Sequence, residues 1–196
     1  RRSDLDPTSE NPDCFVVLDV SDPDWPMLLG TYPSGGYAME VVDNLVYLAG
    51  QWGLQIVDVS NPVAPVLRAE CSVGGTGMDV AVAGNHAYVA AYPEDLKIVD
   101  ISNPPTPRLV GSCPVAYGAA AVAVSDSLAY VAAPQSGGLL VFDVRFPTAP
   151  RLRGSFPVSS GGIALADGLV YAACGDGGLY IFQHTITSAG RWSLYR

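Results

Sequence analysis

A short motif that ends in a proline occurs four times in this chain of 196 residues, and it constrains the fold more than any other feature. The copies read DVSDPDWP (19–26), DVSNPVAP (58–65), DISNPPTP (100–107) and DVRFPTAP (143–150). Their first aspartate recurs every 39 to 43 residues, and a tyrosine recurs in the same phase at positions 47, 88, 130 and 171. Independent markers that keep one period indicate an array of similar structural units.

Each repeat unit divides into four short apolar segments that are bounded by Gly, Pro, Asn or Asp. In the unit 37–73 the segments read AMEVVD, LVYLAG, LQIVDVS and PVLRAECSV, and the units 77–115 and 119–158 repeat this pattern. Such segments predict β-strands, and no stretch keeps the 3.6-residue apolar period of a helix. Four antiparallel strands repeated at about 40–45 residues are typical of a β-propeller blade. The sequence therefore predicts an all-β propeller with almost no helix.

The proline motif lies between the third and fourth segments of each unit. Its Ser and Asn can bond nearby backbone amides in a turn, and its first Pro removes a backbone donor and ends the ladder. The last Pro then begins an edge strand, where a missing N–H is tolerated. One turn that is needed four times explains the repeated Asp better than four active sites do, so we interpret it as structural.

The segments LQIVDVSNPVAP and LKIVDISNPPTP closely resemble the LVIVD repeat family, whose members are β-propellers of bacterial and archaeal surface or secreted proteins. The resemblance extends from residue 14 to about residue 183. It weakens at LLVFDVRFPTAP, where Arg145 and Phe146 replace Ser-Asn, and it breaks at LYIFQHTITSAG, which lacks both prolines. It implies the propeller fold and an extracellular or cell-surface location, and it implies no catalytic motif and no cofactor.

The repeat array does not divide evenly into complete units. The expected divisions are an acidic N-terminal segment (1–13), the repeats (14–183) with partial units at 14–33 and 162–183, and a C-terminal tail (184–196). The first partial unit has only a third and a fourth strand, and the last has only the first three. With about four blade equivalents, we expect part of a longer propeller. The alternative is a small four-bladed ring in which PMLLGTYP (26–33) serves as the last outer strand.

Charge and hydropathy exclude two classes of partner. The net charge is −9, and the ten Lys and Arg residues form no cluster of the kind that neutralises nucleic-acid phosphates. No apolar run approaches the roughly 18–20 residues that a bilayer-spanning helix needs, so we expect no membrane insertion of this segment.

The four cysteines and two histidines show no metal or triad pattern, and no cofactor is expected. Cys71 and Cys113 occupy equivalent positions that an aromatic residue fills in other units. This substitution pattern predicts a buried apolar position, so both thiols are expected to be reduced and buried. Cys14 and Cys174 would approach each other only if the two chain ends meet.

Propeller geometry places the hairpins between second and third strands, and the connections from fourth to first strands, on one face, which we call the loop face. The residues that vary from blade to blade on this face are Tyr37, Gln51, Trp52, Tyr92, Glu94, Asp95, Tyr117, Gln135 and Asp176. Variable aromatic and polar residues on a regular scaffold suit a binding surface, although ordinary loop drift gives the same variation. Glu40 and Asp79 interrupt the apolar first strands, where they would face the central channel or a solvated edge.

Three functions are compatible with this pattern. We favour a non-catalytic interaction module of a secreted or cell-surface protein, which binds a protein or glycan partner through the loop face. The first alternative is a carbohydrate-binding module that uses Trp52, Tyr92 and Tyr117 as platforms for sugar rings. The second is a hydrolase with Glu40 and Asp79 as channel carboxylates. Unpaired strand edges also predict pairing with flanking blades or another chain.

Overall fold

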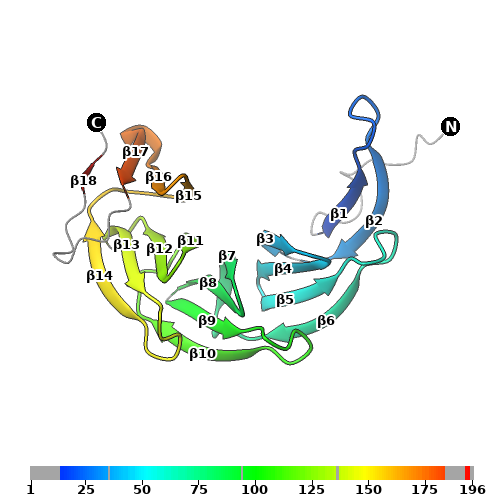
Figure 1. Cartoon of the computed structure of the whole chain (residues 1–196), viewed down its shortest axis with the longest axis horizontal. Coiled ribbons are helices and arrows are strands. Elements are labelled where there is room, and N and C mark those ends of the chain that lie inside the picture. Colours follow the sequence, from blue (N-terminus) through cyan, green and yellow to red (C-terminus); the bar gives the residue numbers. More distant parts are fainter. Residues whose placement is uncertain (1–13, 35, 94, 136, 184–192, 195–196) are drawn as a thin grey trace.

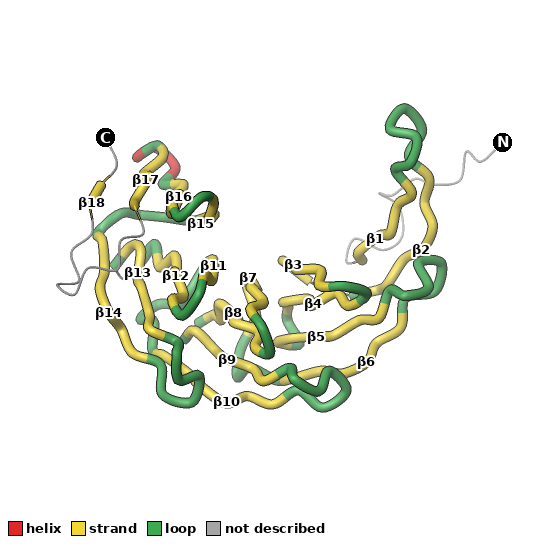
Figure 2. The backbone as a smooth tube through the Cα atoms, viewed as in Figure 1, coloured by secondary structure: helices red, strands yellow, loops and turns green. Residues whose placement is uncertain are grey.

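The computed structural model describes residues 14–34, 36–93, 95–135, 137–183 and 193–194. In these residues the chain forms five antiparallel sheets, arranged side by side along an open arc (Figure 1). Figure 2 shows that loops and strands make up almost the whole backbone, and the single helical turn described is the three-residue 3-10 helix η1 (Gly175–Gly177). The predicted all-β architecture of four-stranded antiparallel blades is confirmed.

The first sheet has two strands, and each of the next four sheets has four. We call the first sheet the half-blade; it contains β1 (Cys14–Asp19) and β2 (Met27–Pro33). The first blade contains β3 (Gly36–Val42), β4 (Leu45–Gly50), β5 (Gly53–Asp58) and β6 (Val66–Cys71), and the second contains β7 (Thr76–Ala83), β8 (His86–Tyr92), β9 (Leu96–Asp100) and β10 (Arg108–Cys113). The third contains β11 (Ala121–Ser125), β12 (Leu128–Ala133), β13 (Gly138–Asp143) and β14 (Arg151–Phe156), and the fourth contains β15 (Gly162–Ala166), β16 (Leu169–Ala173), β17 (Leu179–Gln183) and β18 (Ser193–Leu194).

The two ends of the array differ from the sequence-based expectation. β18 pairs with β17, so the fourth blade gains its outer strand from the segment 184–196 that was expected to be a tail. β2 pairs with β1 and not with the fourth blade, and the sheets do not close into a ring. The small four-bladed ring is therefore not the arrangement that the structure shows. β1, which begins at Cys14, and β16, which ends one residue before Cys174, lie at opposite ends of the open arc (Figure 1).

The repeated proline motif closes the same turn in four sheets. The motif aspartates accept the backbone N–H two residues later, with donor–acceptor distances of 2.9, 2.7, 2.9 and 3.1 Å for Ser21, Ser60, Ser102 and Arg145. The carbonyl before the first Pro accepts the N–H three residues on, as between Asn61 and Ala64 at 3.0 Å. The structural interpretation of the Asp is confirmed, but the Asp carboxylate caps the backbone where the sequence suggested the Ser or Asn side chain.

The core lies between neighbouring sheets. The recurring tyrosine of the second strand is buried at Tyr47, Tyr88 and Tyr130, each in a cluster that joins two adjacent blades. Cys71 and Cys113 are buried free thiols, as predicted. Burial raises the pKa of the Cys113 thiol to about 11, with a smaller contribution from the Asp95 carboxylate. These cysteines therefore pack as small apolar side chains.

Candidate functional site

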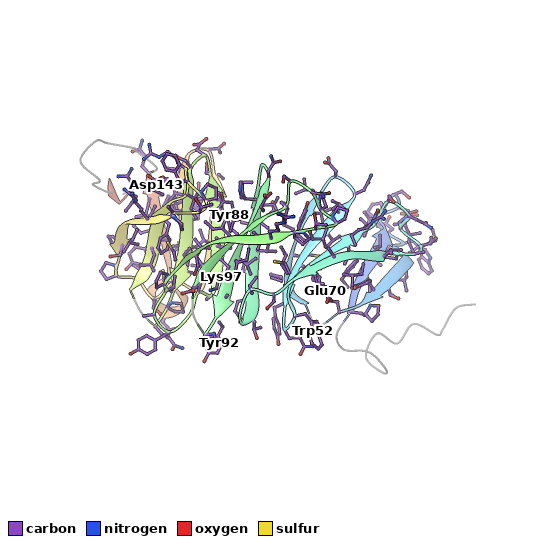
Figure 3. The ribbon with its side chains drawn as sticks, turned by 90° about the horizontal axis from the view of Figure 1, so that it is seen from below. Trp52, Glu70, Tyr88, Tyr92, Lys97 and Asp143 are labelled. Atoms are coloured by element: carbon purple, nitrogen blue, oxygen red, sulfur yellow. The ribbon has the colours of Figure 1, made fainter. Side chains whose placement is uncertain are left out.

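The loop face carries most of the exposed aromatic residues that the sequence singled out. Figure 3 shows Trp52 and Tyr92 at one edge of the array and Asp143 at the opposite edge. The side chains of Tyr37, Trp52, Tyr92 and Tyr117 are 54–70% exposed. Exposed aromatic residues on loops are the usual anchors of a binding surface.

Four of the predicted residues line one hollow between the second and third blades. Its volume is about 570 Å³, and it contains Tyr92, Asp95, Tyr117 and Gln135. Tyr92 and Asp95 belong to the β8–β9 hairpin, Tyr117 to the connection from β10 to β11, and Gln135 to the β12–β13 hairpin. Pro93, Pro114, Val115 and Ala116 complete the lining with apolar surface. The fold thus gathers aromatic and polar side chains from three segments into one site.

Gly118 positions the Tyr92 side chain. A β-carbon at residue 118 would lie 2.8 Å from Cδ2 of the Tyr92 ring, so the ring lies against the backbone of this glycine. Gly118 also adopts a φ of +89°, which favours glycine. Gly118 could not be identified as a site residue from the sequence, because its contact with Tyr92 depends on how two blades pack.

Tyr117 is held in an uncommon backbone conformation. Its φ is +60°, and the N–H of Gly118 donates to the carbonyl of Val115 at 3.0 Å across the turn. A left-handed conformation costs an L-residue with a side chain roughly 1–2 kcal/mol. The Tyr117 side chain is 70% exposed, so little packing offsets this cost. Strained backbone conformations of this kind cluster at functional sites.

Asp95 is a fixed carboxylate in the wall of the hollow. Its Oδ2 accepts hydrogen bonds from Lys97 Nζ and Ser112 Oγ, both at 2.6 Å. Burial raises the pKa of Asp95, but the bonds from Lys97 and Ser112 and the charge of Lys97 outweigh burial and bring the pKa below its usual value. Asp95 therefore remains an anion whose position is set by β9 and β10.

The remaining predicted loop-face residues lie elsewhere. Asp176 lines a second hollow of about 630 Å³ between the third and fourth blades, together with Pro134, Ser159 and Tyr180. This hollow occupies the same place between its blades as the Tyr92–Tyr117 hollow does between the second and third blades. Tyr37, Gln51 and Trp52 belong to the lining of neither hollow, and Glu94 lies outside the described residues.

The two carboxylates of the first strands link neighbouring blades. The N–H of Val82 donates to Glu40 Oε2 at 2.5 Å, and the N–H of Val122 donates to Asp79 Oδ2 at 2.9 Å. Glu40 lines a central hollow of about 320 Å³ formed by the inner strands, whereas Asp79 is not part of that lining. Burial raises the pKa of Asp79, against the lowering effect of hydrogen bonds from Val122 and Val80. Both carboxylates thus bind the inner strand of the next blade.

The described part of the chain holds neither a metal-binding cluster nor a membrane-spanning helix. No three His, Cys, Asp or Glu side chains gather there in the way that a metal ion requires. No helix among these residues has the length and apolar character that crossing a membrane requires.

The sequence pattern of the LVIVD repeat matches residues 12–33, 35–73, 74–115 and 118–158. The chain belongs to the LVIVD repeat family. The first match covers the half-blade, and the next three cover the first, second and third blades of this LVIVD protein. The fourth blade lies beyond the matches, in agreement with its lost aspartate and prolines.

Solved structures show the same fold at low sequence identity. A protein from Lactobacillus plantarum is 14% identical with a TM-score of 0.75, over 92% of this chain and 63% of that chain. The Myceliophteria thermophila Cps50 (Swd1) β-propeller domain is 16% identical with a TM-score of 0.71, over 93% and 65% of the two chains. The computationally designed protein Ika8 is 14% identical with a TM-score of 0.68, over 96% and 59%.

These three similarities establish the propeller-like fold alone. The LVIVD chain spans about three fifths of the length of each of the three structures. No curated protein matches its sequence.

Proposed function

We propose that this LVIVD module is a non-catalytic binding module of a secreted or cell-surface protein, and that it holds a segment of a partner protein in the Tyr92–Tyr117 hollow. One observation carries the proposal. Tyr92 and Tyr117 come from different connections, yet both stand exposed at the same hollow, and Tyr117 does so in a strained conformation. Tyrosines supply large amphipathic contact area with few rotatable bonds, which suits recognition.

The chemistry of the hollow indicates what the partner presents. Asp95 is a fixed anion in the wall, and Tyr92 and Tyr117 offer aromatic faces. A Lys or Arg side chain of a partner would pair with Asp95 and could stack on a tyrosine ring by a cation–π contact. The net charge of −9 favours approach of such a basic segment. We therefore expect a basic or aromatic peptide segment as the preferred ligand.

A sugar ligand is the second candidate. Sugar rings stack on exposed aromatic faces, and Asp95 and Gln135 line the same hollow as hydrogen-bonding groups. A glycan would use the aromatic rings and these polar groups without requiring a basic residue. Binding to a glycan array, lost on Tyr92→Ala and Tyr117→Ala, would favour this function over peptide binding.

Peptide display on this chain tests the proposed function. Selected basic or aromatic peptides should lose at least about tenfold in affinity with Tyr92→Ala or Tyr117→Ala, in the range of interface hot spots. Trp25→Ala is the matched control, because Trp25 is an exposed aromatic residue that belongs to a turn on the opposite face. If selected peptides bind the tyrosine variants as tightly as the native chain, the hollow is not the binding site.

The location requires its own measurement. The secreted or cell-surface assignment rests on the family resemblance. Fractionation of cells that carry the intact natural protein, combined with protease treatment of whole cells, would show whether the repeats are outside.

A further inference from the structure

Three of the scarce basic residues gather around one hollow at the edge opposite the loop face. The chain has 10 Lys and Arg residues against 19 Asp and Glu. Arg145, Arg151 and Arg153 nevertheless line a single hollow of about 210 Å³ beside the β13–β14 connection, together with Asp143. Figure 3 places Asp143 at the edge of the array away from Trp52 and Tyr92. We call this the arginine hollow.

One buried carboxylate holds two of these arginines in place. Asp143 Oδ2 accepts from Nη2 of Arg145 and from Nη2 of Arg153, each at 2.7 Å. Nε of Arg145 donates to Asp143 Oδ1 at 3.0 Å, and Nε of Arg153 donates to Oδ2 at 3.1 Å. Both arginines are more than half exposed, while Asp143 is buried. Each guanidinium therefore presents its Nη1 donors, which Asp143 does not use, in a fixed orientation.

The arginine hollow carries an excess of positive charge. Its three arginines face one aspartate, which leaves a local charge of +2. Arg151 has no ion pair among the described residues, whereas Arg145 and Arg153 share Asp143. The equivalent aspartate of the first blade, Asp58, binds a single arginine, Arg68. The excess is thus particular to the third blade.

The lining of the arginine hollow also includes apolar side chains. Phe146 and Leu152 line the same hollow, and both side chains are exposed. Phe146 replaces the Asn that stands at this place in the first and second blades, and Arg145 replaces their Ser. The two substitutions that depart from the repeat therefore supply a guanidinium and an aromatic ring to one hollow.

We propose that the arginine hollow binds an oxyanion carried on an aromatic ring, that is, an aryl phosphate or an aryl sulfate. Guanidinium groups recognise phosphate and sulfate oxygens through paired N–H donors. A local charge of +2 matches the nearly double negative charge of an aryl phosphate near pH 7 and exceeds the single charge of an aryl sulfate. Phe146 stacks with the ring that carries the oxyanion. The ligand is either a free small molecule or a modified tyrosine of a protein, since both present the same chemistry.

Calorimetric titration with phenyl phosphate and with inorganic phosphate tests the site. Phenyl phosphate should bind about two- to twelvefold more tightly, because stacking on an aromatic ring contributes roughly 0.5–1.5 kcal/mol. Arg145→Ser should weaken both ligands by about tenfold, as loss of a hydrogen bond to a charged group implies. Phe146→Asn should weaken phenyl phosphate and leave inorganic phosphate unchanged.

The residues at equivalent positions of the other blades define suitable substitutions. Arg145→Ser and Phe146→Asn restore the residues that the first and second blades carry, and Arg151→Val restores Val66 of the first blade. These changes should leave folding intact, which thermal unfolding checks. Arg68→Ala is the control, because it removes an exposed β6 arginine that pairs with the equivalent aspartate of the first blade, and it should not change binding.

Phosphotyrosine and sulfotyrosine peptides separate the two ligand sources. Peptide affinity about tenfold above that of phenyl phosphate would identify a modified protein as the source, and equal affinity would identify a free aryl anion. The proposal is wrong if phenyl phosphate shows no saturable binding. It is also wrong if folded Arg145→Ser and Arg151→Val variants bind phenyl phosphate as the native chain does.

Discussion

Gly111 lies directly beneath the carbonyl oxygen of Pro147, and a β-carbon at residue 111 would overlap that oxygen. Gly30 has the same relation to Pro62 at the boundary of the half-blade and the first blade. In both places the outer strand of one sheet meets the proline turn of the next sheet. The repeated motif therefore has two tasks: it closes its own turn, and it packs against the preceding blade.

Gly111→Ala should destabilise the protein. The added methyl group meets backbone rather than a flexible side chain, so the blades must shift, at an expected cost of about 1–3 kcal/mol in the free energy of unfolding. Urea unfolding measures this loss. Gly161→Ala is the control, because a β-carbon there would meet open space. Ala69 is the equivalent residue of the first blade, so the boundary between the first and second blades already accommodates a methyl group. Equal stability of the Gly111→Ala and Gly161→Ala variants would contradict the contact.

The repeat units could be predicted because their signals are local. The proline motif, the tyrosine of the second strand and the residues that bound each strand recur within a single blade. Contacts such as Gly111 with Pro147 could not be predicted, because they depend on how neighbouring blades pack. β18 also escaped prediction: Ser193–Leu194 carries no proline motif, and only its pairing with β17 identifies it as a strand.

The candidate site was predictable in part. Propeller geometry placed Tyr92, Asp95 and Tyr117 on one face, and the structure brings these three into one hollow. Propeller geometry did not indicate that Asp176 would line a different hollow. The left-handed conformation of Tyr117 had no sequence signal, since glycine or asparagine is the usual residue for such a position.

Asp79→Ala should weaken the contact between the second and third blades. The Asp79 carboxylate accepts the N–H of Val122 across the boundary and the N–H of Val80 in its own strand. Alanine leaves these partly buried donors without a partner, and each unsatisfied donor costs about 1–3 kcal/mol. Differential scanning calorimetry should show a lower unfolding temperature. Asp176→Ala removes an exposed carboxylate as a control and should change stability little. A thermally unaffected Asp79→Ala variant would show that water replaces the carboxylate.

Asp58 should contribute to acid unfolding. Hydrogen bonds from the Ser60 side chain and backbone, followed by those from Arg68, lower the pKa of Asp58 from 3.8 to about 2. Because the native pKa lies below the unfolded one, the stabilisation is fully present above pH 3.8 and is lost as the pH falls towards 2. In Asp58→Asn, the unfolding free energy should depend less on pH across this window. Urea titrations at a series of pH values measure the slope. Asp24→Asn, which changes an exposed residue, should follow the native curve; an Asp58→Asn curve parallel to it would refute the assignment.

Tyr117→Asn should separate stability from binding. Asparagine tolerates the left-handed conformation that Tyr117 adopts at a φ of +60°, so the variant should be as stable as the native chain or up to about 1 kcal/mol more stable. The same change removes an exposed aromatic ring from the hollow that Tyr92 shares, so affinity for selected peptides should fall about tenfold or more.

Chemical unfolding and peptide binding, measured on the same Tyr117→Asn preparation, decide between a functional and a structural role. A residue kept for packing loses stability when it is truncated, whereas a residue kept for recognition loses affinity and retains or gains stability. Tyr92→Ala is the comparison, because the Tyr92 ring packs on Gly118 and its removal should lower both quantities. If Tyr117→Asn destabilises the chain and leaves peptide affinity unchanged, the strained turn is a packing feature. The binding function would then have to be sought away from this hollow.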